Sequence, residues 1–220
     1  MKSRIEQLAI LGGEPEFGQP LYVGAPNIGH REAFLGRVNQ IFDSGRLTNR
    51  GPFVVEFERR LAEYLQVKHV IAMCNATVAL EIASRACFLH GEVLIPSLTF
   101  VATAHSLQWQ GIRPVFVDVD PQTWLIDPAR IEEQITPNTT GIIGVHLWGR
   151  PCDIEALEEV AQRNRLKLLF DAAHAFGVSH RGRPIGGFGS AEVFSFHATK
   201  VINTFEGGAV ATNDDEIAER

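Results

Sequence analysis

The chain has 220 residues, of which 45% are hydrophobic and 21% are charged, a balance typical of soluble globular proteins rather than disordered or membrane proteins. Its 26 acidic and 20 basic residues give a formal net charge of −6, and no run rich in Lys and Arg predicts a nucleic-acid surface. The three cysteines lie far apart without CxxC spacing, which argues against structural zinc or a disulfide framework and favours a reducing compartment.

The first 30 residues contain many Gly and Pro and show no hydrophobic period. We predict that residues 1–30 form an extended arm that packs on another part of the structure. Charges interrupt the short apolar run near the start, so no signal peptide is expected. No apolar stretch approaches the roughly 18 residues that a membrane span needs, and we therefore expect a cytoplasmic protein without a membrane partner.

Helical and strand-like patterns follow the arm in a regular order. Apolar residues at helical spacing predict helices over residues 32–42 and 53–65. Further helices are expected over residues 76–89, 100–109, 131–135 and 154–163, and another begins at residue 214. Short apolar runs predict strands over residues 69–73, 92–95, 114–119, 140–146, 167–170, 191–196 and 208–211.

Strands that alternate with helices indicate a mostly parallel sheet covered on both faces, a three-layer α/β sandwich. A chain of this length can bury roughly 70% of its unfolded surface in one core, so we expect residues 31–220 to form one domain. Ligands bind such sheets at the carboxyl ends of the strands, and the candidate site residues are therefore sought where strands end.

Lys200 and Asp171 each follow an apolar strand pattern. A lysine in an apolar setting has a lowered pKa and can form an imine with a carbonyl, although most lysines at strand ends are simply exposed. A carboxylate at position 171 can pair with a protonated ring nitrogen and make a pyridine cofactor a better electron sink. Capping the helix that follows is an equally good explanation for Asp171 from its position alone.

Three further candidates lie at strand or helix ends. The hydroxyl of Ser195 could donate to a phosphate, and the N–H groups of Ala76 and Thr77 at a helix start could hold the same phosphate. A plain helix cap explains residues 75–77 at least equally well. Phe100 could stack on a flat ring, although a lone aromatic in an apolar stretch is more often a core residue.

The scattered cysteines and the positions of His146, His174 and His197 do not favour metal ligation. No GxGxxG fingerprint follows the first strand, which disfavours a nicotinamide oxidoreductase, and neither a Walker A loop nor a GxSxG nucleophile elbow is present.

Six motifs occur in an order that resembles the DegT/DnrJ/EryC1/StrS sugar aminotransferases, which are pyridoxal-phosphate enzymes of fold type I. They are SLTFVATA (97–104), PVFVDVD (114–120), HLWG (146–149), DAAHA (171–175), SFHATK (195–200) and EGGAV (206–210). The resemblance runs from about residue 20 to the end of the chain. It implies the large, cofactor-binding domain of that fold and a homodimer with active sites shared across its interface.

The resemblance also implies a role for each candidate residue. Lys200 would form the Schiff base with pyridoxal 5'-phosphate and then move the proton between substrate and cofactor carbons. Asp171 would pair with the pyridine nitrogen, and Phe100 would stack on one ring face. Ser195, Ala76 and Thr77 would hold the phosphate. His174 would contact the ring or its 3-hydroxyl, at a position where family members often have Gln.

The function implied by the resemblance is transfer of an amino group from an amino acid, usually glutamate, to a nucleotide-linked keto-sugar. The segment CNATVAL (74–80) is similar to that of family members that aminate the C4 keto group of a dTDP-4-keto-6-deoxyhexose, and this likeness implies such an acceptor. A non-catalytic cofactor-binding module on the same fold is the alternative. A sugar dehydratase relative typically has histidine in place of the lysine, so Lys200 argues against that class.

Family members continue beyond the end of this sequence into a smaller C-terminal domain. That domain and a loop asparagine that reaches the neighbouring subunit's cofactor phosphate are missing from the 220 residues. We therefore expect these residues alone to bind the cofactor but to show weak or no transamination.

Overall fold

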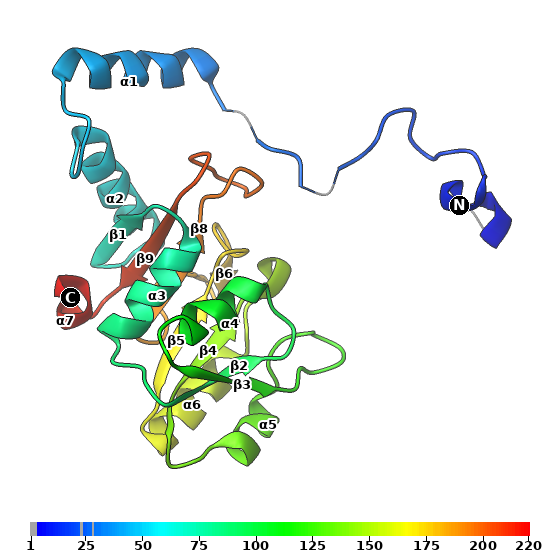
Figure 1. Ribbon diagram of the computed structural model, residues 1–220, viewed down its shortest axis with the longest axis vertical. Helices are drawn as coiled ribbons and strands as arrows, with labels where there is room; N and C mark the ends of the chain where they lie inside the picture. Colours follow the sequence, from blue (N-terminus) through cyan, green and yellow to red (C-terminus); the bar gives the residue numbers. More distant parts are fainter. Residues whose placement is uncertain (1–3, 23, 28) are drawn as a thin grey trace.

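The computed structural model describes residues 4–22, 24–27 and 29–220. Seven strands form one sheet in the order β1-β9-β8-β5-β4-β2-β3 (Figure 1). They are β1 (His69–Met73), β2 (Glu92–Pro96), β3 (Arg113–Val117), β4 (Thr139–Val145), β5 (Lys167–Asp171), β8 (Ala191–Ser195) and β9 (Gly208–Thr212). The α-helices are α1 (Arg31–Ser44), α2 (Pro52–Leu65), α3 (Ala76–Ala86), α4 (Val101–Gln108), α5 (Pro128–Ile131), α6 (Ile154–Asn164) and α7 (Asp215–Glu219).

The sheet is mostly parallel, as the sequence predicts. β2 pairs in parallel with β3 and β4, β4 with β5, and β5 with β8. β9 runs antiparallel to both of its neighbours, β1 and β8. The carboxyl ends of β4, β5 and β8 therefore lie at one edge of the sheet.

Two hydrophobic clusters cover the two faces of this sheet and confirm the three-layer sandwich. Side chains of α2, α5 and α6 pack on one face against alternate strand residues such as Leu94, Phe170 and Phe194. Side chains of α3, α4 and α7 pack on the other face against the intervening strand residues, among them Leu169 and Val193. The period of two along each strand thus sends successive side chains into opposite layers.

Most predicted elements differ from the structure only at their ends. The helix predicted over residues 76–89 ends at Ala86, because Cys87 caps it and Phe88 adopts a positive φ of 58°. The helix predicted over 131–135 begins at Pro128 and continues as a 3-10 turn, Glu132–Gln134. A two-stranded hairpin of β6 (Ser179–His180) and β7 (Arg183–Pro184) is not predicted by the pattern.

Residues 4–22 and α1 extend away from the sheet (Figure 1). Two 3-10 turns, η1 (Ile5–Gln7) and η2 (Ala9–Leu11), occur within the predicted arm. None of the α1 side chains is buried, although Phe34 contacts Phe205 edge to face with ring centroids 5.2 Å apart. The division of the chain into an arm (1–30) and a domain (31–220) stays a prediction.

Candidate active site

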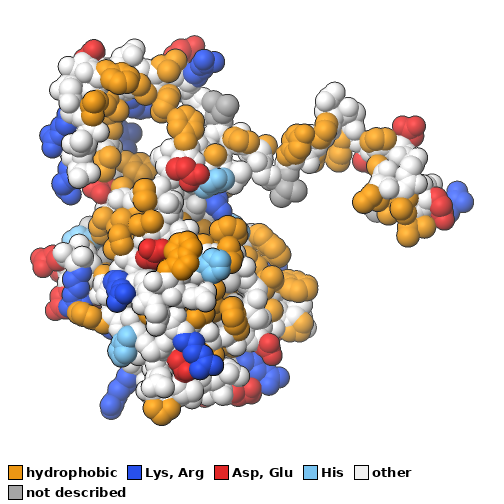
Figure 2. All heavy atoms as spheres, in the orientation of Figure 1, with side chains coloured by type: hydrophobic (Ala, Val, Ile, Leu, Met, Phe, Trp, Pro, Cys, Tyr) orange, Lys and Arg blue, Asp and Glu red, His pale blue; other side chains and the backbone are white. Residues whose placement is uncertain are grey.

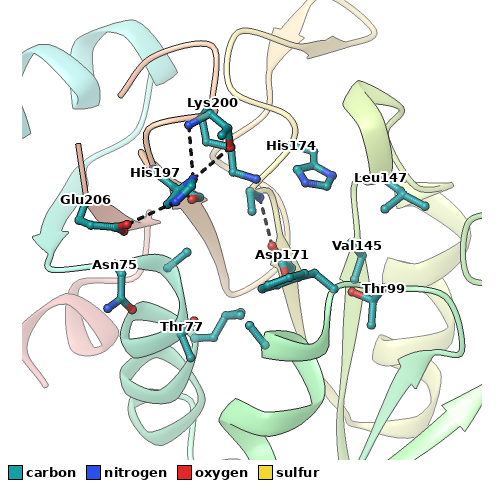
Figure 3. Close-up of a pocket in the computed structure, with 17 residues that line it drawn as sticks. Asn75, Thr77, Thr99, Val145, Leu147, Asp171, His174, His197, Lys200 and Glu206 are labelled. Atoms are coloured by element: carbon teal, nitrogen blue, oxygen red, sulfur yellow. Dashed lines mark hydrogen bonds and ion pairs between the residues drawn. The ribbon is translucent and has the colours of Figure 1, made fainter. Parts of the chain in front are cut away.

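A cavity of about 370 Å³ lies where β4, β5 and β8 end, between the starts of α3 and α4. Its volume falls within the range of small-molecule sites. All seven residues predicted from the sequence line this cavity: Ala76, Thr77, Phe100, Asp171, His174, Ser195 and Lys200. In Figure 3 Lys200, His174 and Asp171 surround the centre of the cavity, while Asn75 and Thr77 lie toward α3.

Asp171 is the last residue of β5 and its side chain is buried. One carboxylate oxygen, Oδ1, accepts a hydrogen bond from the backbone N–H of Ala173 at 3.1 Å. The other, Oδ2, accepts one from the hydroxyl of Thr103 at 2.8 Å. A carboxylate has about four lone-pair sites, so two donors leave capacity for a third at the cavity wall.

Lys200 follows β8 in a turn that its own N–H closes on the carbonyl of His197 at 2.9 Å. Partial burial lowers the pKa of the Lys200 amine, and the negative charge of Asp171 opposes that shift. The sign follows from desolvation, which disfavours the charged ammonium form. A larger fraction of this amine is therefore neutral, and hence nucleophilic, than for an exposed lysine at the same pH.

The N-terminus of α3 forms one end of the cavity. Asn75 caps the helix by accepting the N–H of Val78 at 2.9 Å, and the N–H groups of Ala76 and Thr77 belong to the first turn, where no intrahelical acceptor exists. Such N–H groups and the helix dipole favour an anion. The Ser195 hydroxyl lines the same cavity from β8.

Gly208 lets these groups approach one another. It pairs with Met73 of β1 on one side and with Ser195 of β8 on the other. A Cβ at position 208 would stand 2.5 Å from the carbonyl carbon of Asn75 and 2.6 Å from the nitrogen of Ala76. Only glycine fits this approach without displacing the start of α3.

His174 lies on the Lys200 side of the cavity. The backbone N–H of Trp148 points at its Nδ1 at 3.5 Å. Partial burial and then the nearby charge of Lys200 lower the pKa of His174, and Asp171 partly offsets both. The neutral imidazole is favoured at physiological pH, so the ring can supply either a donor or an acceptor to a bound molecule.

Several polar residues in or next to this cavity received no role in the sequence analysis. His197 and Glu206 line the cavity and approach each other to 3.4 Å between Nε2 and Oε1. Thr99 lines it as well, and its hydroxyl lies 2.8 Å from that of Thr103. Two threonines four residues apart at a helix start were the available signal for the last pair, since such residues share one helix face.

His146 follows the last residue of β4 and is fully buried. Its ring stacks on Phe170 with centroids 4.6 Å apart, and its Nδ1 accepts the N–H of Cys152. Within residues 4–22, 24–27 and 29–220, no group of three or more His, Cys, Asp or Glu side chains could hold a metal ion. In the same part of the chain, no helix is both long and apolar enough to cross a membrane.

The donor set fits a planar aldehyde that carries a ring nitrogen and a phosphate. The amine of Lys200 can bond the aldehyde, and the buried carboxylate of Asp171 can pair with the ring nitrogen. The start of α3 can bind the phosphate. Phe100 is 68% exposed although apolar, and it lines the cavity where a ring could stack on it.

Comparison with known proteins agrees with this chemistry. The family model described as the DegT/DnrJ/EryC1/StrS aminotransferase family matches residues 29–220. The chain is 45% identical over 202 residues to dTDP-4-amino-4,6-dideoxy-D-glucose transaminase of Shigella dysenteriae, covering 92% of the chain and 55% of that protein. It is 42% identical over 200 residues to GDP-perosamine synthase of Caulobacter vibrioides, covering 90% of the chain and 53% of that protein.

Solved structures show the same fold. The structure of DesI in the presence of its TDP-sugar product matches with a TM-score of 0.93 at 50% identity, covering 98% of the chain and 55% of DesI. NtdA of Bacillus subtilis with bound cofactor PMP matches with a TM-score of 0.80 at 34% identity, covering 86% of the chain and 43% of NtdA. The chain thus spans about half the length of the relatives it matches.

Proposed function

The chain belongs to the DegT/DnrJ/EryC1/StrS aminotransferase family, which is dependent on pyridoxal phosphate, and from this membership we propose that it transfers an amino group to a nucleotide-linked keto-sugar. The observation that carries the proposal is the placement of Lys200, Asp171 and the α3 N-terminus around one cavity. These are the amine, carboxylate and anion site that the cofactor needs.

When bound, pyridoxal phosphate takes the amino nitrogen of a donor and passes it to a carbonyl, so that an amino acid and a keto-sugar become a keto acid and an amino sugar. We assign Ala76, Thr77 and Ser195 to the phosphate and Asp171 to the ring nitrogen. Phe100 would cover one ring face, and His174 would contact the ring or its 3-hydroxyl. Lys200 Nζ would hold the cofactor through its aldehyde and would carry a proton between the reacting carbons.

The acceptor we propose is a dTDP-4-keto-6-deoxyhexose, with glutamate as the amino donor. Two relatives support a TDP-linked sugar: the Shigella dysenteriae transaminase, at 45% identity, and DesI, at 50% identity. The Caulobacter vibrioides relative, at 42% identity, is named for a GDP-linked sugar.

The test combines cofactor binding with amine transfer. The purified chain is loaded with pyridoxal phosphate and incubated with glutamate and one of two acceptors. The acceptors are dTDP-4-keto-6-deoxyglucose and GDP-4-keto-6-deoxymannose. We expect mass spectrometry to detect the amino sugar formed from the dTDP acceptor, at a slow rate for these 220 residues alone. The yield with the GDP acceptor should be at least about tenfold lower. An equal or greater yield with the GDP acceptor would contradict the dTDP-linked substrate, and a chain that does not bind pyridoxal phosphate would contradict the proposed function.

We further propose that two copies of the chain associate through the arm and α1. Figure 2 shows apolar side chains on the surface of both segments. The exposed ones include Ile10, Leu21, Phe34 and Phe42. Exposed apolar surface of this extent marks an interaction site. The N-terminal residues also reach the Lys200 loop, because the side chain of Asn27 donates to the carbonyl of Val201 at 3.0 Å.

Sedimentation equilibrium checks the association. We expect twice the 24.3 kDa mass of one chain at micromolar concentration. Phe42→Glu should weaken the dimer at least about tenfold, because it places a charge in an apolar contact. Phe116→Glu is the matched control, since Phe116 is 54% exposed on the outer strand β3, and it should leave the mass unchanged. A monomeric wild-type chain would contradict the proposal.

The three cysteines are free, with Cys87 and Cys152 buried and Cys74 exposed. Free thiols are typical of proteins in reducing compartments. This supports the cytoplasm as the proposed location.

A further inference from the structure

A chain of two hydroxyl groups leads from the start of α4 to the carboxylate of Asp171. Thr99 Oγ1 lies 2.8 Å from Thr103 Oγ1, and Thr103 Oγ1 lies 2.8 Å from Asp171 Oδ2. Thr103 is fully buried, and Asp171 is 68 residues away in the sequence. The contact is therefore a tertiary one that joins a helix to a strand end.

The direction of these hydrogen bonds follows from the groups themselves. An ionised carboxylate only accepts, so Thr103 must use its single hydroxyl proton on Asp171. Thr103 can then only accept from its other neighbour, which makes Thr99 the donor. Hydrogen bonds aligned in one direction polarise one another, so the bond to Asp171 gains strength from Thr99.

Thr103 acts on the orientation of the carboxylate. The terminal torsion of an aspartate side chain has broad, weak minima and does not by itself fix the carboxylate plane. Thr103 holds Oδ2, and the N–H of Ala173 holds Oδ1 from a different element. With both oxygens held, the plane is fixed before any molecule enters the cavity.

The helix that orients Asp171 also carries the exposed ring of Phe100. Phe100 immediately precedes α4, between Thr99 and Thr103, and it lines the cavity. The start of α4 therefore fixes where a ring stacked on Phe100 would lie. Through Thr103 it also fixes the orientation of the Asp171 carboxylate that the ring nitrogen would meet.

We propose that Thr103, supported by Thr99, is a positioning residue that aims the Asp171 carboxylate at the ring nitrogen of the cofactor. The proposal rests on the proposed function, because it assumes a ring nitrogen in this cavity. Thr103 does not line the cavity and would touch neither cofactor nor substrate.

The test compares pyridoxal phosphate with 1-deazapyridoxal phosphate, in which a CH group replaces the ring nitrogen. Binding of each to the purified chain is measured by absorbance titration for wild type, Thr103→Val and Thr103→Ser. We expect Thr103→Val, which keeps the side-chain shape but loses the hydroxyl, to weaken pyridoxal phosphate binding roughly tenfold. Its affinity for the deaza analogue should change less than about twofold, and Thr103→Ser should restore wild-type values.

Two further outcomes would overturn the proposal. Equal weakening of both ligands by Thr103→Val would show a general structural role, and Thr103→Ser behaving like Thr103→Val would exclude the hydroxyl. If Thr103→Val does not fold, as judged by circular dichroism, Thr99→Val replaces it, with an expected loss of about threefold for pyridoxal phosphate only. A wild-type chain that binds neither ligand would instead contradict the proposed function.

Discussion

Replacing Lys200 by alanine is expected to abolish the covalent bond to pyridoxal phosphate and to lower amino transfer at least about 1,000-fold. The amine of Lys200 is the group placed to bond the aldehyde, and its lowered pKa increases the neutral fraction that reacts. The measurement is reduction with borohydride followed by peptide mass spectrometry, which finds the cofactor fixed to the peptide that contains residue 200 in the wild type only.

Lys167→Ala is the matched control for Lys200, because Lys167 is an exposed lysine at the start of β5, outside the cavity. The Lys167→Ala variant should retain both the cofactor adduct on the peptide that contains Lys200 and the wild-type rate of amino transfer. The wild-type rate of adduct formation should rise with pH and reach its midpoint below the ordinary lysine pKa of about 10.4. An adduct of equal yield in the Lys200→Ala protein would show that another group reacts with the aldehyde.

Replacing Asp171 by asparagine should weaken pyridoxal phosphate binding roughly 10- to 100-fold, the size expected for losing a hydrogen bond to a charged group. The amide keeps the shape of the side chain but removes the charge that would face a protonated ring nitrogen. Absorbance titration measures the affinity. The same variant should lower the pKa of Lys200 further, because the negative charge of Asp171 currently raises it.

Asp118→Asn provides the comparison for Asp171. Asp118 also follows a strand of the sheet, β3, but it is exposed and lies outside the cavity. It should bind pyridoxal phosphate with wild-type affinity. If Asp171→Asn and Asp118→Asn bound the cofactor equally well, the carboxylate at 171 would have no role toward the ring.

The layers of this fold could be predicted because local patterns determine them. Leu168, Leu169 and Phe170 of β5 alternate between the two hydrophobic clusters, and the apolar face of α6 has the spacing of a helix packed on a sheet. The antiparallel direction of β9 could not be predicted in this way. A buried strand has the same apolar composition in either direction, and only its partners β1 and β8 distinguish the two.

Some residues of the site could likewise be predicted from local sequence patterns, and others could not. Lys200, Asp171 and Ser195 stand where strands end, so the rule for ligands in parallel sheets points to them before any contact is known. Thr103 escapes that rule because it lies inside a helix and its partner is 68 residues distant. The exposure of α1 also could not be predicted, since an amphipathic pattern shows that a face is apolar without showing what covers it.

The antiparallel strand β9 has a consequence for how the molecule folds. β1 ends just before the α3 N-terminus and lies at one end of the strand order, next to β9. The register joins His69 to Thr212, which are far apart in the sequence. Pairings of such long sequence separation require the closure of a large loop and form late. Gly208, the first residue of β9, is also what brings Ser195 and the start of α3 together. We therefore expect the phosphate-binding end of the cavity to assemble after the parallel strands, so that cofactor binding reports that β9 has joined the sheet.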